Sequence, residues 1–221
     1  MAAAFRTTSR RIEMADSGSD PLVIRKLEFI GGMASADGWR PESELPEIAF
    51  AGRSNVGKSS LLNRLVKRKA FARVSRTPGR TREINFFRVN SSFIMADLPG
   101  YGYAKVSKEK KADWKPLIEG YLRHTPKLAG VVQLLDIRRE PSDDDVAMLD
   151  YLAELELPAV IVLTKKDKLS RQAAEERAAE IMDGLSLSRD QTISFSSLTG
   201  EGRDELAAAI MSLVGTAERT S

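Results

Sequence analysis

A glycine-rich motif follows a short apolar run in the first quarter of this chain: Gly52-Arg53-Ser54-Asn55-Val56-Gly57-Lys58-Ser59, preceded by Ile48-Ala49-Phe50-Ala51. The spacing is that of a phosphate-binding loop between a strand and a helix. Glycines allow successive backbone N–H groups to face one anion, and the following helix adds its positive N-terminal end. We expect Lys58 to contact the β- and γ-phosphates of a nucleotide and the Ser59 hydroxyl to bind Mg²⁺. The alternative is a glycine turn before an ordinary helix, and the agreement of strand, spacing and Lys-Ser argues against it.

The composition limits the class of protein. With 221 residues, 42% of them apolar and 29% charged, the chain has the length and composition of one globular domain. No apolar run approaches the roughly 20 residues that a membrane-spanning helix needs. The absence of cysteine excludes disulfides and thiolate metal sites, and Ala2 stands where myristoylation requires glycine. We therefore expect a cytoplasmic protein without a membrane partner.

Three segments are expected along the chain. Residues 1–21 are poor in apolar side chains and predict a disordered tail. Two interpretations of its start stay open: translation from Met14, or a short presequence-like segment that ends at Glu13 and Asp16. Residues 22–44 hold an apolar-alternating piece and a Gly/Pro-punctuated link, which predict an extension packed on the domain. The main domain covers residues 45–219.

Within the main domain, apolar runs of strand length alternate with segments of helical periodicity. This rhythm predicts an α/β fold with a mostly parallel six-stranded sheet and helices on both faces. The tight turn Asn90-Ser91 makes its two flanking strands antiparallel. Ligands of such sheets bind at the carboxyl ends of the strands. The predicted strands are 48–51, 84–89, 92–96, 131–135, 159–163 and 192–195.

Two further motifs point to a bound triphosphate. Asp97-Leu98-Pro99-Gly100 follows a predicted strand, where the carboxylate reaches Mg²⁺ through water and the Gly100 N–H contacts a γ-phosphate. The loop at residues 76–81 contains Thr77 and Thr81, of which one is expected to complete the Mg²⁺ shell. We choose Thr81, because it directly precedes the strand that starts near Ile84.

A motif after the fifth predicted strand points to guanine. In Thr164-Lys165-Lys166-Asp167, the carboxylate can accept hydrogen bonds from the N1–H and N2–H₂ groups that adenine lacks. Lys165 would lay its aliphatic stem along the base. Asn is more usual than Thr at the first position. The polar loop that starts at Ser196-Ser197 supplies N–H groups for the guanine O6. The motifs in this order predict a GTPase rather than a kinase or an ATPase.

These motifs, together with the string Asp97-Leu98-Pro99-Gly100-Tyr101-Gly102-Tyr103-Ala104, closely resemble the EngB-type (YihA/YsxC) bacterial GTPases. These belong to the TRAFAC class and the TrmE-Era-EngA-EngB-Septin-like group of P-loop GTPases, and Thr164 is usual among them. The resemblance covers residues 22–215. It implies a Ras-like G domain, GTP or GDP with Mg²⁺ as ligands, a role in assembling the large ribosomal subunit through its RNA, and a link to cell division and septation.

The motifs and the resemblance together define the expected site. We expect Lys58, Thr81, Gly100 and Asn55 to take part in catalysis. The expected metal contacts are Ser59, Thr81 and, through water, Asp97. The expected nucleotide contacts are Gly52, Arg53, Ser54, Asn55, Val56, Gly57, Lys58, Ser59, Gly79, Arg80, Thr81, Arg82, Glu83, Asp97, Leu98, Pro99, Gly100, Thr164, Lys165, Lys166, Asp167, Phe195, Ser196 and Ser197.

The catalytic set has a gap. Many GTPases place a glutamine after Asp-x-x-Gly to orient the attacking water, whereas this chain has Tyr101. We therefore expect slow hydrolysis by the isolated protein and acceleration by its partner. Two roles for Asn55 stay open: helping to hold K⁺ where an arginine finger would lie, as the resemblance suggests, or stabilising the turn of the loop.

The distribution of charge along the chain indicates the class of partner. Residues 48–82 contain ten Lys or Arg and no Asp or Glu, more cations than a nucleotide triphosphate needs. They form either a solvated face or a footprint for a polyanion such as RNA. We expect a monomer. The competing functions are a protein- or membrane-docking signalling GTPase and a metabolic phosphoryl-transfer enzyme.

Overall fold

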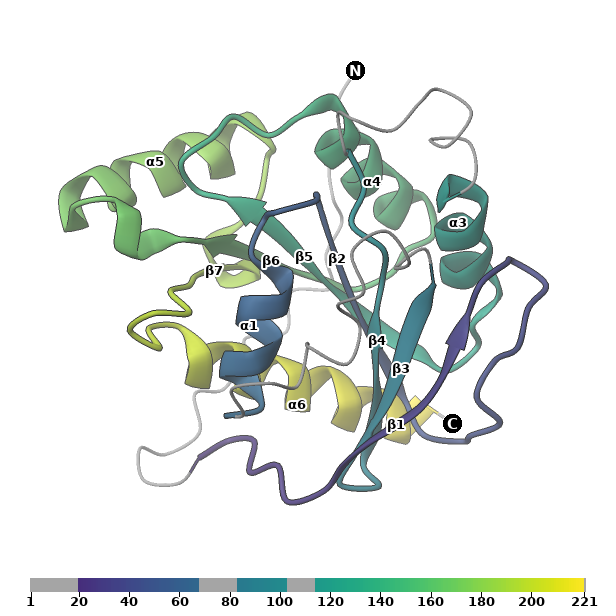
Figure 1. The fold of residues 1–221 in the computed structure, drawn as a ribbon. Coiled ribbons are helices and arrows are strands. Elements are labelled where there is room, and N and C mark those ends of the chain that lie inside the picture. Colours follow the sequence, from purple (N-terminus) through teal and green to yellow (C-terminus); the bar gives the residue numbers. More distant parts are fainter. Residues whose placement is uncertain (1–19, 68–82, 103–113, 221) are drawn as a thin grey trace.

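The computed structural model describes residues 20–67, 83–102 and 114–220, and Figure 1 shows their fold. A seven-stranded sheet has the order β1-β3-β4-β2-β5-β6-β7. Its centre is β2 (Glu47–Gly52), which pairs in parallel with β4 (Phe93–Asp97) and β5 (Leu128–Asp136). The parallel part continues through β6 (Ala159–Thr164) and β7 (Thr192–Ser194). The predicted α/β class with a mostly parallel sheet is confirmed.

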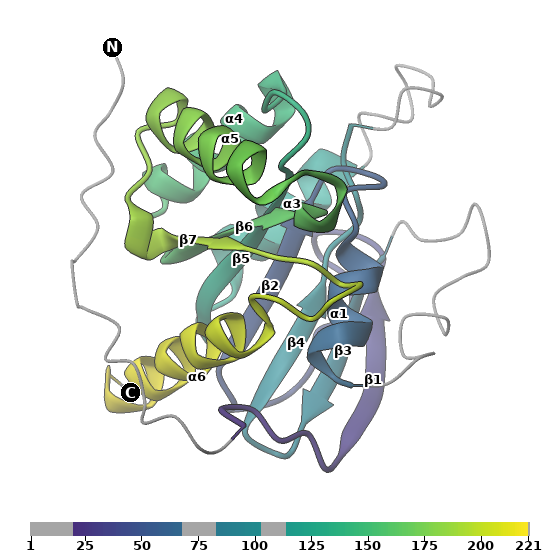
Figure 2. The same cartoon turned by 90° about the vertical axis from the view of Figure 1, so that its left-hand side faces the viewer.

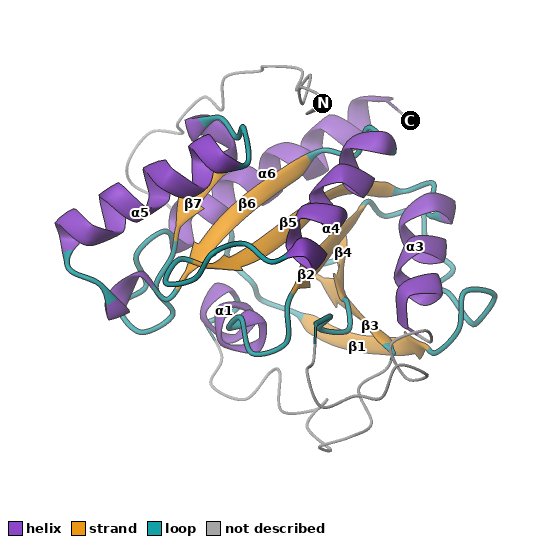
Figure 3. Ribbon diagram, turned by 90° about the horizontal axis from the view of Figure 1, so that it is seen from above, coloured by secondary structure: helices purple, strands orange, loops and turns teal. Residues whose placement is uncertain are grey.

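Helices cover both faces of this sheet, as Figures 2 and 3 show. On one face, α1 and α6 share a core with Phe50 and Val132, while α3, α4 and α5 cover the other face. Because both faces are covered, every residue of β2 and β4 is buried. The helices are α1 (Lys58–Leu65), α3 (Trp114–His124), α4 (Asp143–Glu154), α5 (Arg171–Gly184) and α6 (Arg203–Thr220), with short 3₁₀ turns at Lys166–Lys168 and Arg189–Gln191.

The sheet has one strand more than we predicted. β1 (Leu27–Met33) comes from the segment that we assigned to an extension, and it pairs antiparallel with β3 (Ile84–Val89). The pairing shifts register between Phe29 and Gly31, which marks a bulge. A strand with a glycine pair in its second half and Phe29 half exposed at the edge lacks the continuous apolar run of a central strand. The prediction of six strands was wrong for this reason.

The turn Asn90-Ser91 joins β3 to β4, which pair antiparallel as predicted. Both residues have positive φ, 51° and 59°, as a type I′ hairpin turn requires. The Asn90 side chain also accepts hydrogen bonds from the backbone N–H groups of Arg25 and Lys26, at 2.8 and 2.9 Å. One turn residue therefore fixes both the hairpin and the chain that enters β1.

The N-terminus of α4 has a capping box. The Ser142 hydroxyl accepts from the Asp145 N–H at 3.4 Å, and the Asp145 carboxylate accepts from the Ser142 N–H at 2.9 Å. On this helix Asp145 and Met148 are buried, whereas Val146 is exposed. A carboxylate on the buried side of a helix needs polar partners there.

A buried arginine fastens the first described residues to the domain. Arg203, the first residue of α6, donates to the backbone oxygens of Leu22 and Leu65 at 2.7 and 3.1 Å and pairs with Asp20. Burial raises the pKa of the Asp20 carboxyl, but hydrogen bonds from Arg203 and Lys67 outweigh burial and lower the pKa to about 2. Asp20, which we placed in the tail, therefore has partners in the domain, whereas residues 1–19 lie outside the described part.

Replacing Arg203 tests this attachment. Arg203→Met should lower the free energy of unfolding by about 2 to 4 kcal/mol, because it leaves two carbonyls without their donor and removes the buried cation from the Asp20 carboxylate. Urea unfolding at pH 7 measures the loss. The Asp20 pKa is lowered from 3.8 to about 2, so this part of the stability exists above pH 3.8 and fades as the pH falls towards 2.

The matched control is Lys67→Ala, which removes the other cation from the same carboxylate. The Lys67 side chain is 62% exposed, so its ion pair should contribute below about 1 kcal/mol. Equal losses in the two variants would contradict the assignment of Arg203 as the anchor.

Candidate functional site

The glycine-rich motif forms a loop between β2 and α1, as predicted. β2 ends at Gly52 and α1 begins at Lys58. Between them Asn55 has φ 64° and Gly57 has φ 110°, so two left-handed residues turn the backbone within three positions. Gly57 is also the N-cap residue of α1, a position where its conformation strongly favours glycine. The backbone N–H groups at the helix N-terminus are therefore available to an anion.

Lys58 and Asp97 meet beside this loop. Their side chains form an ion pair in which the lysine is 12% exposed and the aspartate 8%. They come together because β2 and β4 are parallel neighbours, so Gly52 and Asp97 both end strands at the same edge. A largely buried lysine and a buried carboxylate at the mouth of the loop can hold a phosphate and its counterion.

The Asp-x-x-Gly segment lies directly against the loop. The Ser54 N–H donates to the Tyr101 carbonyl at 2.7 Å, and Arg53 and Tyr101 form a parallel bridge. A side chain at Gly100 would place its Cβ 3.1 Å from Ser54 Cα, so only glycine fits this approach without displacing the loop. The Gly100 N–H is thereby held close to the phosphate-binding residues.

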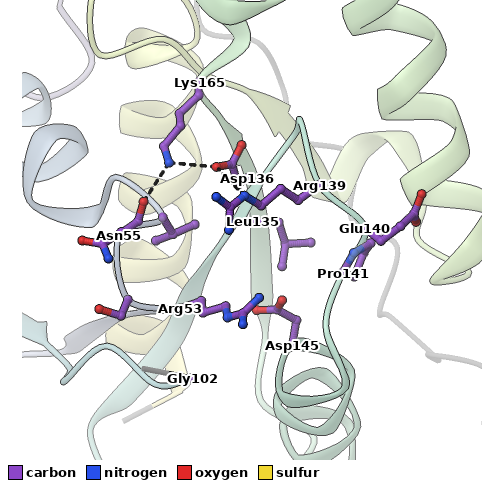
Figure 4. A pocket seen from close by; sticks show the side chains of 12 residues that line it. Arg53, Asn55, Gly102, Leu135, Asp136, Arg139, Glu140, Pro141, Asp145 and Lys165 are labelled. Carbon is purple, nitrogen blue, oxygen red and sulfur yellow. Dashed lines mark hydrogen bonds and ion pairs between the residues drawn. The ribbon is translucent and has the colours of Figure 1, made fainter. Parts of the chain in front are cut away.

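The predicted guanine motif is attached to the same loop. Thr164 is buried, and its hydroxyl lies 2.7 Å from the Val56 carbonyl and 3.1 Å from the Leu135 carbonyl, to which it can donate. The Lys165 ammonium donates to the Asn55 carbonyl at 2.7 Å and to Asp136 at 2.8 Å, as Figure 4 shows. The threonine that departs from the usual asparagine therefore makes a specific contact to the phosphate-binding loop.

Asp167 is held ionised by its neighbours. The Ser196 hydroxyl donates to Asp167 Oδ1 at 2.8 Å, and this hydrogen bond, the largest cause, lowers the pKa of the Asp167 carboxyl. Lys166 N–H donates to the Phe195 carbonyl at 3.1 Å, which joins the two predicted base-binding loops. Ser197 lies partly exposed next to this joint. An ionised carboxylate in this position can accept two donors from one edge of a base.

The structure adds residues that sequence reasoning missed. Asp136 ends β5 and binds both Lys165 and Arg138, with 2.8 Å contacts to each. Burial raises the pKa of the Asp136 carboxyl, but these cations outweigh burial and hold the pKa well below its usual range. Arg64 of α1 donates to the Thr199 carbonyl at 2.6 Å, which links α1 to the loop that starts at Ser196. The available signal for Asp136 was its place at the carboxyl end of a predicted strand.

A cleft of about 330 Å³ opens on the outer side of the loop. Figure 4 shows Arg53 running from the loop toward Asp145, with Asp136 and Arg139 above it. Lys58 and Asp97 do not line this cleft, so it is a neighbour of the phosphate position rather than the position itself.

Part of the expected site falls outside the described residues. Gly79, Arg80, Thr81 and Arg82 lie there, so their predicted roles at the metal and the nucleotide stay predictions. Glu83 is described and is exposed at the start of β3. In the ranges 20–67, 83–102 and 114–220, no group of three or more His, Cys, Asp or Glu is placed to hold a metal ion. Within the same ranges no helix has both the length and the apolar character to cross a membrane.

Comparison with known proteins agrees with this geometry. Residues 47–165 match the family model described as 50S ribosome-binding GTPase. A relative from Gemmatimonas aurantiaca, the probable GTP-binding protein EngB, is 61% identical over 193 residues, covering 87% of this chain and 95% of the relative. Its namesake from Citrifermentans bemidjiense is 47% identical over 196 residues, covering 89% and 91%. The crystal structure of a probable GTP-binding protein EngB superimposes with a TM-score of 0.66 at 26% identity, covering 77% of this chain and 99% of that one.

Replacing Thr164 tests its contact with the loop. Thr164→Val keeps the volume but removes the donor to the Val56 carbonyl, so we expect a loss of about 1 to 2 kcal/mol in stability and about tenfold weaker binding of GDP. Thermal unfolding and titration with fluorescent GDP measure the two effects. Thr164→Ser keeps the hydroxyl and is the matched control. If Val and Ser bind GDP equally well, the hydroxyl does not support the loop.

Proposed function

Because this chain belongs to the EngB family of GTP-binding proteins, we propose that it is a slowly hydrolysing GTPase whose nucleotide state controls its work in assembling the large ribosomal subunit. By family resemblance this work supports normal cell division and septation. We propose a cytoplasmic monomer built from a tail (1–21), an extension (22–44) and a G domain (45–219). Its ligands are GTP or GDP with Mg²⁺ and the RNA of the large subunit or its precursor.

One observation supports the proposed binding of a nucleotide. The phosphate-binding loop is hydrogen-bonded both to the Asp-x-x-Gly segment and to the guanine motif. The loop backbone receives donors from Thr164 and Lys165 and gives one to Tyr101. Phosphate-binding and base-binding groups are therefore held at a fixed separation. In the proposed complex Lys58 binds the β- and γ-phosphates, and Asp167 selects guanine.

The residues present fit Mg²⁺, which prefers oxygen ligands. Ser59 lies in the first turn of α1, next to Lys58, and Asp97 ends the neighbouring strand. In the proposal Ser59 and Thr81 bind the ion directly and Asp97 binds it through water. When bound, the ion neutralises charge that develops on the phosphate oxygens.

Slow hydrolysis is supported by the place of Tyr101. Its side chain is buried with 1% exposure, and its hydroxyl donates to Asp145 at 2.8 Å. This hydroxyl is occupied inside the domain, so it does not orient an attacking water. Arg64 donates to the Thr199 carbonyl and Arg53 extends along the outer cleft, so neither arginine points to the phosphate position as an internal finger. A partner that completes the site is consistent with this arrangement.

The ribosomal partner is supported by the family description and by charge. The family model matching residues 47–165 is described as ribosome-binding. Of the ten cations in the acid-free segment 48–82, Lys58 and Arg64 have partners inside the domain, and Lys67 pairs with Asp20. Six lie beyond residue 67, outside the described part. A polyanion would be attracted to such a segment.

Co-sedimentation with large ribosomal subunits and their precursors tests the partner. We expect binding with a non-hydrolysable GTP analogue, at least about tenfold weaker binding with GDP, and weakening with rising salt because phosphate contacts release counterions. Single-turnover GTP hydrolysis should accelerate when the particles are added.

Asp167→Asn is the matched control for that experiment, because it removes the carboxylate that selects guanine and leaves the basic segment unchanged. It should lose the difference between analogue and GDP at nucleotide concentrations that saturate the wild type. Nucleotide-independent sedimentation and unaltered hydrolysis of the wild type would favour a signalling GTPase instead.

The two roles of Asn55 are separated by a comparison of salts. We propose that its side chain helps to hold K⁺ beside the phosphates, so turnover should be about tenfold faster in KCl than in NaCl at equal ionic strength. Asn55→Ala should remove this difference. Asn55 has φ 64°, a conformation that asparagine tolerates well, so Asn55→Gly is the control that keeps the turn without the amide. Equal wild-type rates in both salts would leave only the turn role.

A further inference from the structure

Tyr101 is a buried polar residue that the proposed mechanism does not use. Its hydroxyl donates to Asp145 Oδ1 at 2.8 Å and accepts a hydrogen bond from the side-chain amide of Gln133. Burial raises the pKa of the Tyr101 hydroxyl, and the Asp145 charge raises it further, so the group stays protonated and donates at neutral pH. A tyrosine with two polar partners in the core is fixed in position.

The backbone of the same residue is bound to the phosphate-binding loop. The Tyr101 carbonyl accepts from the Ser54 N–H at 2.7 Å, and Tyr101 forms a bridge with Arg53. Gly100, directly before it, approaches Ser54 so closely that an added Cβ would lie 3.1 Å from its Cα. The backbone of Tyr101 is therefore bound to the loop, and its side chain is bound to α4 and β5.

The partners of the Tyr101 side chain are themselves immobilised. Asp145 Oδ2 accepts from the Ser142 N–H and hydroxyl, at 2.9 and 2.7 Å, in the capping box of α4. Gln133 is fully buried in β5, and its Oε1 has no hydrogen-bond partner among the described residues. A buried amide with one unpaired oxygen costs stability, so its place beside Tyr101 points to a role other than stability.

We propose that Tyr101 is a positioning residue that ties the Asp-x-x-Gly segment to α4 and so holds the Gly100 N–H where it meets a γ-phosphate. This inference rests on the proposed GTP-binding function and adds a residue to it. The Gly100 N–H contacts only the third phosphate, which GDP lacks. Loss of the tether therefore weakens binding of a triphosphate more than binding of a diphosphate, whereas a purely structural residue affects both alike.

The chain contains a matched control for this distinction. Tyr121 is equally buried, and its hydroxyl also donates to a carboxylate at 2.8 Å, that of Glu47. Glu47 begins β2, at the edge opposite to Gly52, so this pair lies at the end of the sheet remote from the phosphate loop. Tyr101→Phe and Tyr121→Phe remove the same atom and the same type of hydrogen bond in two places.

The experiment measures dissociation constants for GDP and for a non-hydrolysable GTP analogue with Mg²⁺, together with urea unfolding, in wild type and both variants. We expect Tyr101→Phe, which breaks two hydrogen bonds, to lose more stability than Tyr121→Phe, which breaks one. Tyr101→Phe should reduce the affinity for the analogue relative to GDP by about tenfold, and Tyr121→Phe should leave that ratio at the wild-type value. Equal ratios in all three proteins, or equal shifts in both variants, would overturn the inference.

Gln133→Met serves if Tyr101→Phe does not fold. It removes one of the two hydrogen bonds to the Tyr101 hydroxyl and also removes the unpaired Oε1, so we expect a folded protein. The ratio should shift in the same direction by about two- to threefold. An unchanged ratio in this variant would count against the tether. Wild-type protein that binds neither nucleotide would overturn the proposed function itself, an outcome separate from an unchanged ratio.

Discussion

The parallel pairing of β2 with β4 on one side and β5 on the other is the constraint on which the site depends. It brings three strand ends to one edge, and each end delivers a polar element: the loop after Gly52, the carboxylate of Asp97 and that of Asp136. Helices on both faces cover the strands, so the buried strand backbone fixes the point from which each of these groups projects. The clustering of charged groups at the site follows from this topology.

Polar groups buried at this edge satisfy one another. The Val56 carbonyl accepts a hydrogen bond from Thr164, and the Asn55 carbonyl accepts one from Lys165. The Lys165 ammonium also donates to Asp136. Leaving such groups unpaired would cost more than each bond contributes, which makes the arrangement cooperative. The loop is therefore braced from outside, on the side away from the phosphates, and its inner N–H groups can face a ligand.

The order of strands and helices, the capping box of α4 and the main motif residues were predictable, because each rests on local spacing that physics ties to a structure. Three features were not. β1 is broken by a bulge and by glycines, so it lacks a strand-like run. Asp136 stands in no motif, and its contact with Lys165 depends on a residue far along the chain. The sequence shows that Tyr101 stands where many GTPases have glutamine. Its hydrogen bonds to α4 and β5 could not be predicted, because they depend on which face of the helix turns inward.

The hydrogen bonds between the predicted base-binding loops and the phosphate-binding loop have a consequence for how one nucleotide binds. Lys165 donates to the Asn55 carbonyl, and Thr164 donates to the Val56 carbonyl. Arg64 of α1 donates to the Thr199 carbonyl. In the proposed complex the two halves of one nucleotide meet subsites that these hydrogen bonds connect, so binding at either end favours order at the other. Coupling of this kind is reciprocal. In that complex the base and the phosphates would bind cooperatively within one molecule of ligand, so they would not contribute independent increments to affinity.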